Sequence, residues 1–252
     1  MKYLQNAQLE CMSNALCTEN GEVQIQCKLE SYSCKMTSDD KRQFKLHSHD
    51  APEYQALSPP QAVYQAGSPV DGCLSGSFKR SVSDAYNSSS LPVEGMLPFV
   101  QSCDVRTLYY LIATMNASFQ PDYDFSNAKS NSFSREPSYS FVASAIRTVM
   151  SGSRCEQFSR LESPLWKSIG TEVDLSSCEI YSYNPDLHSD PYSEEGNLWS
   201  FNYFFFDTKQ KRIVFFSCRA TSVSGMNSQD ESGGDFEDEI PTDWTDEFEM
   251  DY

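Results

Sequence analysis

Residues 199–219 read WSFNYFFFDTKQKRIVFFSCR, two apolar runs on either side of a short basic turn. Runs of this kind around a turn such as DTKQ predict a β-hairpin. Tyr203 and Phe205 fall on one face of the first strand, and Phe204 and Phe206 on the other. A strand that is apolar on both faces indicates a sheet that is covered on both sides. The hairpin therefore predicts an α/β fold of the α+β type, a central antiparallel sheet with helices packed on both faces.

Two more segments have the alternation of strands. CEIYSY at 178–183 alternates apolar and polar residues, and so does VQIQCKLESYSCK from Val23 onward. Because a few strands alone are only marginally stable, the N-terminal strand is expected to join the same sheet as the hairpin.

Helical periodicity predicts four helices. The first spans 5–16, and the second spans 105–119 with Asp104 as its N-cap and Pro121 after its end. The third is expected to be capped by Ser134, to carry Pro137 in its first turn and to bury Phe141, Ala145 and Val149. The fourth is expected at 153–168, with a break at Ser163-Pro164.

The chain of 252 residues is expected to form a single domain with two irregular segments. Residues 1–36 and 103–220 make the folded part. Residues 37–102 are rich in Ser, Pro, Gly and Asn and predict a disordered regulatory insert, because such a segment buries too little apolar surface to offset chain entropy. Residues 221–252 predict a disordered acidic tail.

The net charge of −17 is concentrated at the C-terminal end, where residues 230–252 hold eleven acids and no Lys or Arg. Without the eleven negative charges of these acids, the net charge of −17 becomes about −6 for the rest of the chain. Bulk charge of this sign disfavours nucleic-acid binding and favours a protein partner with a basic face. MKYLQNAQLECM has no apolar core of a signal peptide, and no apolar run approaches the roughly 20 residues of a membrane span, so we expect a soluble intracellular protein.

The cysteines and acids raise the question of metal sites. Nine cysteines occur without CxxC or CxxH spacing, which favours buried reduced thiols over zinc ligands. Two turn-like segments, PDYDFS and NPDLHSDP, hold Asp122, Asp124, Asp186, His188 and Asp190. These residues suit either a divalent-metal site of a hydrolase or ordinary turn hydrogen bonds of Asp beside Pro. No phosphate-binding or nucleophile motif occurs, so no enzyme activity and no cofactor are expected.

Further residues suggest regulation and partner binding. Ser58 and Ser68 each precede Pro, and Ser83 follows Arg80 by three, the contexts of proline-directed and basophilic kinases. The turn cations Lys209, Lys211 and Arg212 fit a solvated turn, a partner contact or part of a nuclear import signal. In the tail, the aromatic residues Phe236, Trp244, Phe248 and Tyr252 lie among the acids. They favour an interaction peptide over a purely solubilising tail.

Three strings resemble the Maf-one (Maf1) family. They are LESYSCKMTSDDK at 29–41, TLYYLIATMNASFQPDYDFSNAKSNSFSREPS at 107–138 and CEIYSYNPDLHSDPYSEEGNLWSFNYFFFDTKQKRIVFFSCR at 178–219. The resemblance covers the ordered segments in order, around a variable insert.

The resemblance implies one α/β domain, no enzyme activity and repression of transcription by RNA polymerase III. It implies that the protein binds the clamp side of the polymerase and blocks engagement with the initiation factor at promoters. Nutrient-responsive kinases and a phosphatase are expected to act on Ser58, Ser68, Ser75 and Ser83, with shuttling between nucleus and cytoplasm.

The resemblance and the charge distribution together lead to one hypothesis, and two alternatives remain from the residues. The hypothesis is a repressor whose acidic surface, including Asp122, Asp124 and the tail, competes for a basic face of the polymerase. The alternatives are the metal-dependent hydrolase and an acidic mimic of nucleic acid that inhibits another basic protein.

Overall fold

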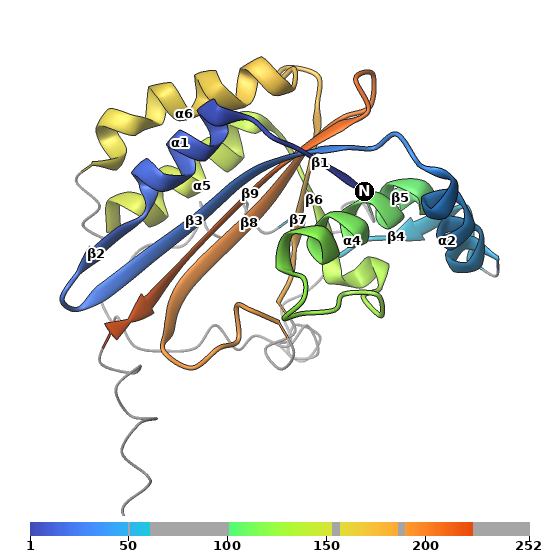
Figure 1. Ribbon diagram of the computed structural model, residues 1–252, viewed down its shortest axis with the longest axis horizontal. Helices are drawn as coiled ribbons and strands as arrows, with labels where there is room; N and C mark the ends of the chain where they lie inside the picture. The colour runs from blue at the N-terminus through green and yellow to red at the C-terminus, as the bar shows by residue number, and fades with distance from the viewer. Residues whose placement is uncertain (50, 61–100, 153–156, 186–189, 224–252) are drawn as a thin grey trace, which may run out of the picture.

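A seven-stranded antiparallel sheet forms the centre of the fold (Figure 1). The computed structural model describes residues 1–49, 51–60, 101–152, 157–185 and 190–223. Within them the strand order is β1–β3–β9–β8–β7–β6, with β2 beside β3. The strands are β1 (Lys2–Leu4), β2 (Thr18–Asn20), β3 (Val23–Ser33), β6 (Phe133–Glu136), β7 (Glu179–Tyr183), β8 (Asn197–Asp207) and β9 (Arg212–Ser222). A separate pair joins β4 (Tyr54–Ala56) to β5 (Ser102–Asp104).

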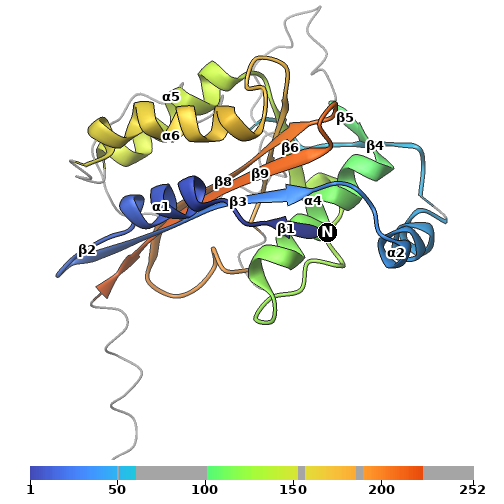
Figure 2. The same cartoon turned by 45° about the horizontal axis from the view of Figure 1, so that its top comes forward.

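Helices cover both faces of this sheet, as the hairpin predicts (Figure 2). One face carries α1 (Ala7–Leu16), α5 (Tyr139–Gly152) and α6 (Phe158–Glu172). The other carries α4 (Val105–Phe119), with α2 (Ser38–Ser48) beside α4 and a short 3₁₀ turn, η2 (Ser130–Ser132), further along the chain. No helix of the described residues combines the length and the apolar character of a membrane span.

The aromatic residues of the hairpin divide between two cores. Tyr203 and Phe205 pack in the core under α1, α5 and α6, whereas Phe204 and Phe206 pack in the core under α4. All four side chains are buried. The two-sided apolar pattern therefore predicted both the strand and its central position correctly.

The N-terminal strand joins the sheet across the insert, as predicted. Cys27 of β3 lies directly opposite Cys218 of β9, and the two form a disulfide. The prediction of reduced thiols is wrong for this pair, because the strand register places both side chains on one face with their Cα atoms 4.2 Å apart. Cys34 and Cys103 are buried free thiols, as predicted, whereas Cys11 and Cys17 are free but exposed, so the predicted burial is wrong for them.

The predicted cap of α4 is correct, whereas α1 begins at Ala7, two residues after its predicted start. Asn6 caps α1 by accepting the backbone N–H groups of Gln8 and Leu9. Asp104 caps α4 by accepting those of Arg106 and Thr107, each over 2.9 Å.

The predicted insert begins later than its composition indicates. Helix α2 starts with a capping box in which Thr37 and Asp40 exchange hydrogen bonds, and its Phe44 ring packs against Tyr109 of α4 with centroids 5.4 Å apart. The helix has only two large apolar side chains, Phe44 and the exposed Leu46, and the N-terminal amine and the Tyr109 hydroxyl also bond to Asp40 in its first turn. The prediction of disorder is therefore wrong for α2 and β4, while residues 61–100 lie outside the described part.

The third predicted helix starts later than expected and buries a different face. Ser134 lies fully buried in β6, where it pairs with Ser182 of β7, so it does not cap a helix. α5 instead begins after Pro137, and Ser138 Oγ accepts the N–H of Phe141 over 3.5 Å. The buried face contains Val142, Ala145, Ile146 and Met150, whereas Phe141 is exposed. Pairing of β6 with a strand 46 residues away cannot be seen in local periodicity.

The fourth helix continues through its proline. α6 spans Phe158–Glu172 with Pro164 inside it, so the predicted break at Ser163-Pro164 is wrong. Pro164 is exposed, while Leu165 and Ile169 on the opposite side are buried. Packing of that apolar face stabilises the helix against the loss of one backbone hydrogen bond.

Candidate functional site

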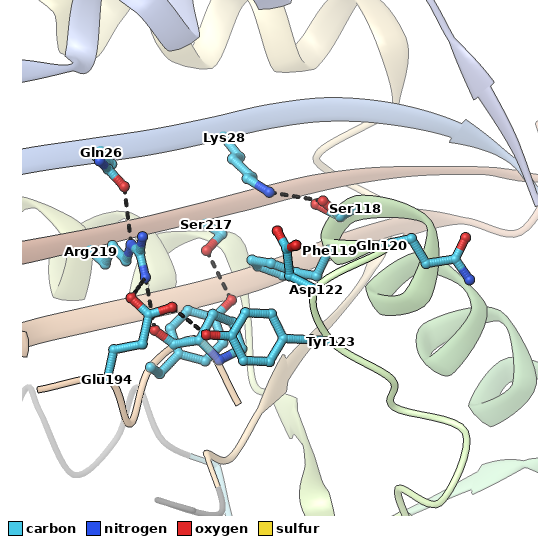
Figure 3. A pocket seen from close by; sticks show the side chains of 12 residues that line it. Gln26, Lys28, Ser118, Phe119, Gln120, Asp122, Tyr123, Glu194, Ser217 and Arg219 are labelled. Atoms are coloured by element: carbon cyan, nitrogen blue, oxygen red, sulfur yellow. Dashed lines mark hydrogen bonds and ion pairs between the residues drawn. The ribbon is translucent and has the colours of Figure 1, made fainter. Parts of the chain in front are cut away.

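A polar pocket of about 160 Å³ opens on the α4 face of the sheet, beyond the end of α4 (Figure 3). Three parts of the chain line it. They are Gln26 and Lys28 of β3 with Ser217 and Arg219 of β9, then Ser118 to Tyr123 at and after the end of α4 (Pro121 excepted), and finally Pro191, Tyr192 and Glu194. The two segments that the sequence singles out thus meet at one site, where Asp122 and Tyr123 of PDYDFS and Pro191 of NPDLHSDP line the pocket.

Lys28 holds the end of α4 at this pocket. Its Nζ donates to the carbonyl oxygen of Ser118 over 2.8 Å and lies 4.2 Å from the centroid of the Phe119 ring. The last carbonyls of a helix lack partners within it, and a cation there is favourable. Burial lowers the pKa of Lys28, because an apolar surrounding disfavours the charged amine.

Arg219 joins β9 to the loop that precedes β8. Its Nε donates to Gln26 Oε1 over 3.1 Å, and its Nη1 donates to Pro191 O over 3.0 Å and to Glu194 Oε2 over 2.5 Å. The hydroxyl of Tyr123 donates to the other oxygen of Glu194. Burial, followed by the bond to Glu194, raises the pKa of Tyr123 to about 12. Glu194 therefore ties the loop after α4 to the sheet (Figure 3).

Tyr192 forms the floor of the pocket together with Phe119 and Ser217. The hydroxyls of Tyr192 and Ser217 lie 2.9 Å apart, and Tyr192 packs edge-on against Phe119 with centroids 5.9 Å apart. Burial raises the pKa of Tyr192. The floor of the pocket is thus rigid, and its polar rim faces solvent.

The acids in the two turns have local partners. Asp124 accepts the backbone N–H of Ser126 over 2.9 Å and its hydroxyl over 2.5 Å, and these bonds lower the pKa of Asp124. Asp190 is buried and accepts the N–H of Tyr192 over 2.9 Å. Turn chemistry accounts for Asp124, while Asp190 also accepts the hydroxyl of Tyr183 over 3.4 Å.

The structure does not assemble the metal site of the hydrolase alternative within its described part. There, no group of three His, Cys, Asp or Glu side chains is placed to hold a metal ion. Asp186 and His188 lie outside the described residues. Asp122 lines the polar pocket, and Asp124 is exposed beside it.

The three cations of the hairpin turn differ in their surroundings. Lys209 and Lys211 are exposed. Arg212 Nη1 donates to Glu172 Oε2 of α6 over 2.8 Å, and Ser31 and Asn6 also donate to this carboxylate. Arg212 therefore anchors the turn to α6, and only the two lysines present free charge.

Ser58 is the one predicted phosphorylation site within the described residues. Its hydroxyl donates to Asn131 O over 2.6 Å, and its N–H donates to Phe133 O over 2.9 Å. Ser134 donates in return to Pro59 O over 2.8 Å. This segment is thus pinned to β6. Ser68, Ser75, Ser83, Phe236, Trp244 and Phe248 lie outside the described part.

Sequence reasoning did not single out the residues at the centre of the pocket. Lys28, Arg219, Glu194 and Tyr192 belong to strands or loops that were interpreted only as structure. One signal was present in FFSCR at 215–219. Along the strand face that begins with the apolar Phe215, the next two residues, Ser217 and Arg219, are polar. That change marks where the cover of α4 ends.

Comparison with known proteins places the chain in a family. The sequence model of the Maf1 regulator family matches residues 25–217. The chain is 31% identical to the "Repressor of RNA polymerase III transcription" of Dictyostelium discoideum, over 96% of this chain and 91% of that protein. It is 32% identical to "Repressor of RNA polymerase III transcription maf1" of Schizosaccharomyces pombe, over 90% and 87% of the two chains.

A solved structure has the same fold. A crystal structure of citrus MAF1 superposes with a TM-score of 0.56 at 27% identity, covering 86% of this chain and 98% of that one. A second crystal form of citrus MAF1 gives a TM-score of 0.54 at 29% identity. The family model, the relatives and the fold agree over both parts of the folded domain, and the chain therefore belongs to the Maf1 regulator family.

Proposed function

We propose that the protein represses transcription by RNA polymerase III, by binding the clamp side of the polymerase and blocking its engagement with the initiation factor at promoters. Support comes from the relatives in Dictyostelium discoideum and Schizosaccharomyces pombe that are named repressors of RNA polymerase III transcription, which match over nearly the whole chain at about 30% identity. The proposal involves no catalytic step.

We infer the binding surface from the hydrogen bond that Tyr123 donates to Glu194. It brings together two loops that are 71 residues apart in sequence. As a result the exposed Asp122 of one loop lines the same pocket as Glu194 of the other, and the carboxylate of Glu194 is paired with Arg219. The exposed carboxylates that remain here without an ion pair to another described residue, Asp122 and Asp124 of the loop after α4, suit a basic partner surface, and such complementarity acts mainly on association rate and specificity.

The experiment is a binding assay followed by a transcription assay. Dephosphorylated full-length protein is titrated against purified RNA polymerase III over a salt series, and promoter-dependent transcription is then measured. We expect binding that weakens with salt and a matching loss of initiation. The double variant Asp122→Asn with Asp124→Asn should bind roughly tenfold more weakly, with a smaller salt dependence.

A matched control removes the same charge elsewhere. Glu19 and Glu22 are exposed at the β2 end of the sheet, and Glu19→Gln with Glu22→Gln should leave binding unchanged. Equal weakening by both double variants would show that only bulk charge matters. Absence of polymerase binding by the unsubstituted protein at low salt would overturn the proposal.

Regulation is part of the same proposal. We assign Ser58, Ser68, Ser75 and Ser83 as phosphorylation sites of nutrient-responsive kinases, opposed by a phosphatase, with the unphosphorylated protein acting in the nucleus. Alanine at all four positions should make repression and nuclear localisation constitutive. Normal nutrient response of that variant would remove these serines from the switch.

A further inference from the structure

A second hollow lies between α2 and α4 and shares Gln120 with the polar pocket. This groove has a volume of about 500 Å³, within the range of peptide and ligand sites. Its apolar lining includes Leu46 of α2 with Ile112 and Ala113 of α4, and Met1 lies at its side. Leu46 is 76% exposed, the most exposed large apolar side chain of the described residues. Leu46 therefore offers an exposed apolar contact at a groove whose lining mixes apolar and polar side chains.

The helix that borders the groove is basic. Residues 41–46 of α2 read KRQFKL, with Lys41, Arg42 and Lys45 exposed and no acid among them. None of these three cations takes part in an ion pair within the described part of the chain. The guanidinium of Arg106 adds a fourth positive charge, 5.7 Å from the centroid of the Phe44 ring. These cations lie beside the groove and do not line it. The lining also includes the polar side chains of Gln43, Asn116, Gln120 and Ser126. The groove with its basic border thus suits an acidic segment that carries apolar anchors.

The chain carries a segment of that chemistry. Residues 230–252 hold eleven acids and no Lys or Arg, interleaved with Phe236, Trp244 and Phe248. Aromatic anchors seated in an apolar groove with acids facing a basic rim are a recurrent mode of peptide recognition. We propose that this acidic tail docks in cis in the groove between α2 and α4, where it competes with any other acidic segment.

The tail is long enough for this contact. β9 ends at Ser222, and Arg212 at its other end lies beside Ser33, five residues before α2 begins. That distance along the strand is about 33 Å at 3.3 Å per residue. The stretch from Val223 to Trp244 spans up to about 70 Å when extended. Binding within one chain also benefits from an effective concentration that a separate acidic peptide lacks.

Photo-crosslinking of the full-length chain tests the proposal. A photoreactive phenylalanine analogue is placed at position Trp244, and in a second protein at Phe248, and crosslinked peptides are identified by mass spectrometry. We expect crosslinks to α2 and α4 within a single chain, with a yield that does not change on dilution. The double variant Arg42→Glu with Lys45→Glu, and separately Leu46→Ser, should lower this yield about fivefold or more.

The control variant changes equal charge on the other face of the sheet. Arg160 and Lys167 are exposed on α6, and Arg160→Glu with Lys167→Glu should leave the yield unchanged. Thermal unfolding of each variant verifies that it is folded, which is expected because every changed side chain is exposed.

Three outcomes would overturn the proposal. Crosslinks directed to other surfaces would remove the groove as the site. Equal losses from the α2 and α6 variants would show that attraction follows bulk charge alone. Crosslinks found only between two chains, with a yield that falls on dilution, would replace the contact in cis by one in trans. The assay contains no polymerase, so its outcome is independent of the repressor function.

Discussion

The guanidinium of Arg212 donates to the carboxylate of Glu172 over 2.8 Å, a contact between residues 40 apart in sequence. It fixes the end of the hairpin to the C-terminal turn of α6. Glu172 also accepts hydrogen bonds from Ser31 and Asn6, so one carboxylate joins four elements of the chain. Arg212, which the sequence groups with Lys209 and Lys211 in a basic turn, thus helps to hold the folded domain together.

We predict that Arg212→Ala lowers the free energy of unfolding by about 2 to 3 kcal/mol, because it leaves a largely buried carboxylate without its cation. Lys209→Ala at the exposed turn should change it by less than about 0.5 kcal/mol. Urea denaturation followed by circular dichroism measures both. Equal effects of the two substitutions would show that the ion pair does not stabilise the fold.

The N-cap of α4 gives a second prediction. Asp104→Ala should lower the free energy of unfolding by about 1 kcal/mol, since two backbone N–H groups lose their acceptor. Asp104→Asn keeps the acceptor oxygen and should lose only a few tenths of that amount. If the two variants were equally destabilised, charge rather than capping would be the cause.

Phosphorylation of Ser58 should detach its segment from β6. A phosphate cannot donate to Asn131 O as the hydroxyl does, and it adds nearly two negative charges at a partly buried position. We expect the backbone amides of Leu57 and Ser58, which now donate to Gln101 O and Phe133 O, to exchange at least about tenfold faster in Ser58→Asp.

Hydrogen exchange with mass spectrometry measures this effect, and Ser58→Ala is the control. The alanine variant loses one hydrogen bond without added charge, so its exchange should change less. Exchange of residues 54–60 that is unaltered in Ser58→Asp would contradict the prediction.

Lys28 gives a prediction about pH. Burial lowers its pKa in the folded chain below the 10.5 of an ordinary lysine. Between the two values the unfolded chain binds more protons than the folded chain, so stability rises with pH through this window. Measured against Lys28→Met, the unsubstituted protein should gain stability as the pH rises toward 10.5. A difference between the two proteins that stays constant with pH would rule out this desolvation.

Some parts of the fold were predicted and others were not, for definite physical reasons. The hairpin, the N-terminal strand and the cap at Asp104 follow from alternation and from local hydrogen bonds, so they were predicted correctly. Helix α2 was missed because Phe44 is its one large packed side chain against α4. Ser134 was placed in a helix because its true partner, β7, is remote in sequence.

The candidate site was predicted only in part. PDYDFS and NPDLHSDP were recognised as unusual, and both end at the polar pocket. Lys28 and Arg219 were not recognised, since an isolated cation in a strand has no motif. Their partners Ser118 and Glu194 are 90 and 25 residues away along the chain.

By itself the sequence determined the layered architecture, because the period of apolar residues along each strand and helix decides which faces must be buried. It also determined the distribution of charge, with the acids gathered in 230–252. Only the tertiary structure decided which charges are free. Arg212, Arg219 and Lys28 have partners that folding brings from distant parts of the chain, whereas Lys41, Arg42 and Lys45 remain exposed. Charge pairing acts over a few ångströms in space, and distance along a sequence does not measure that separation.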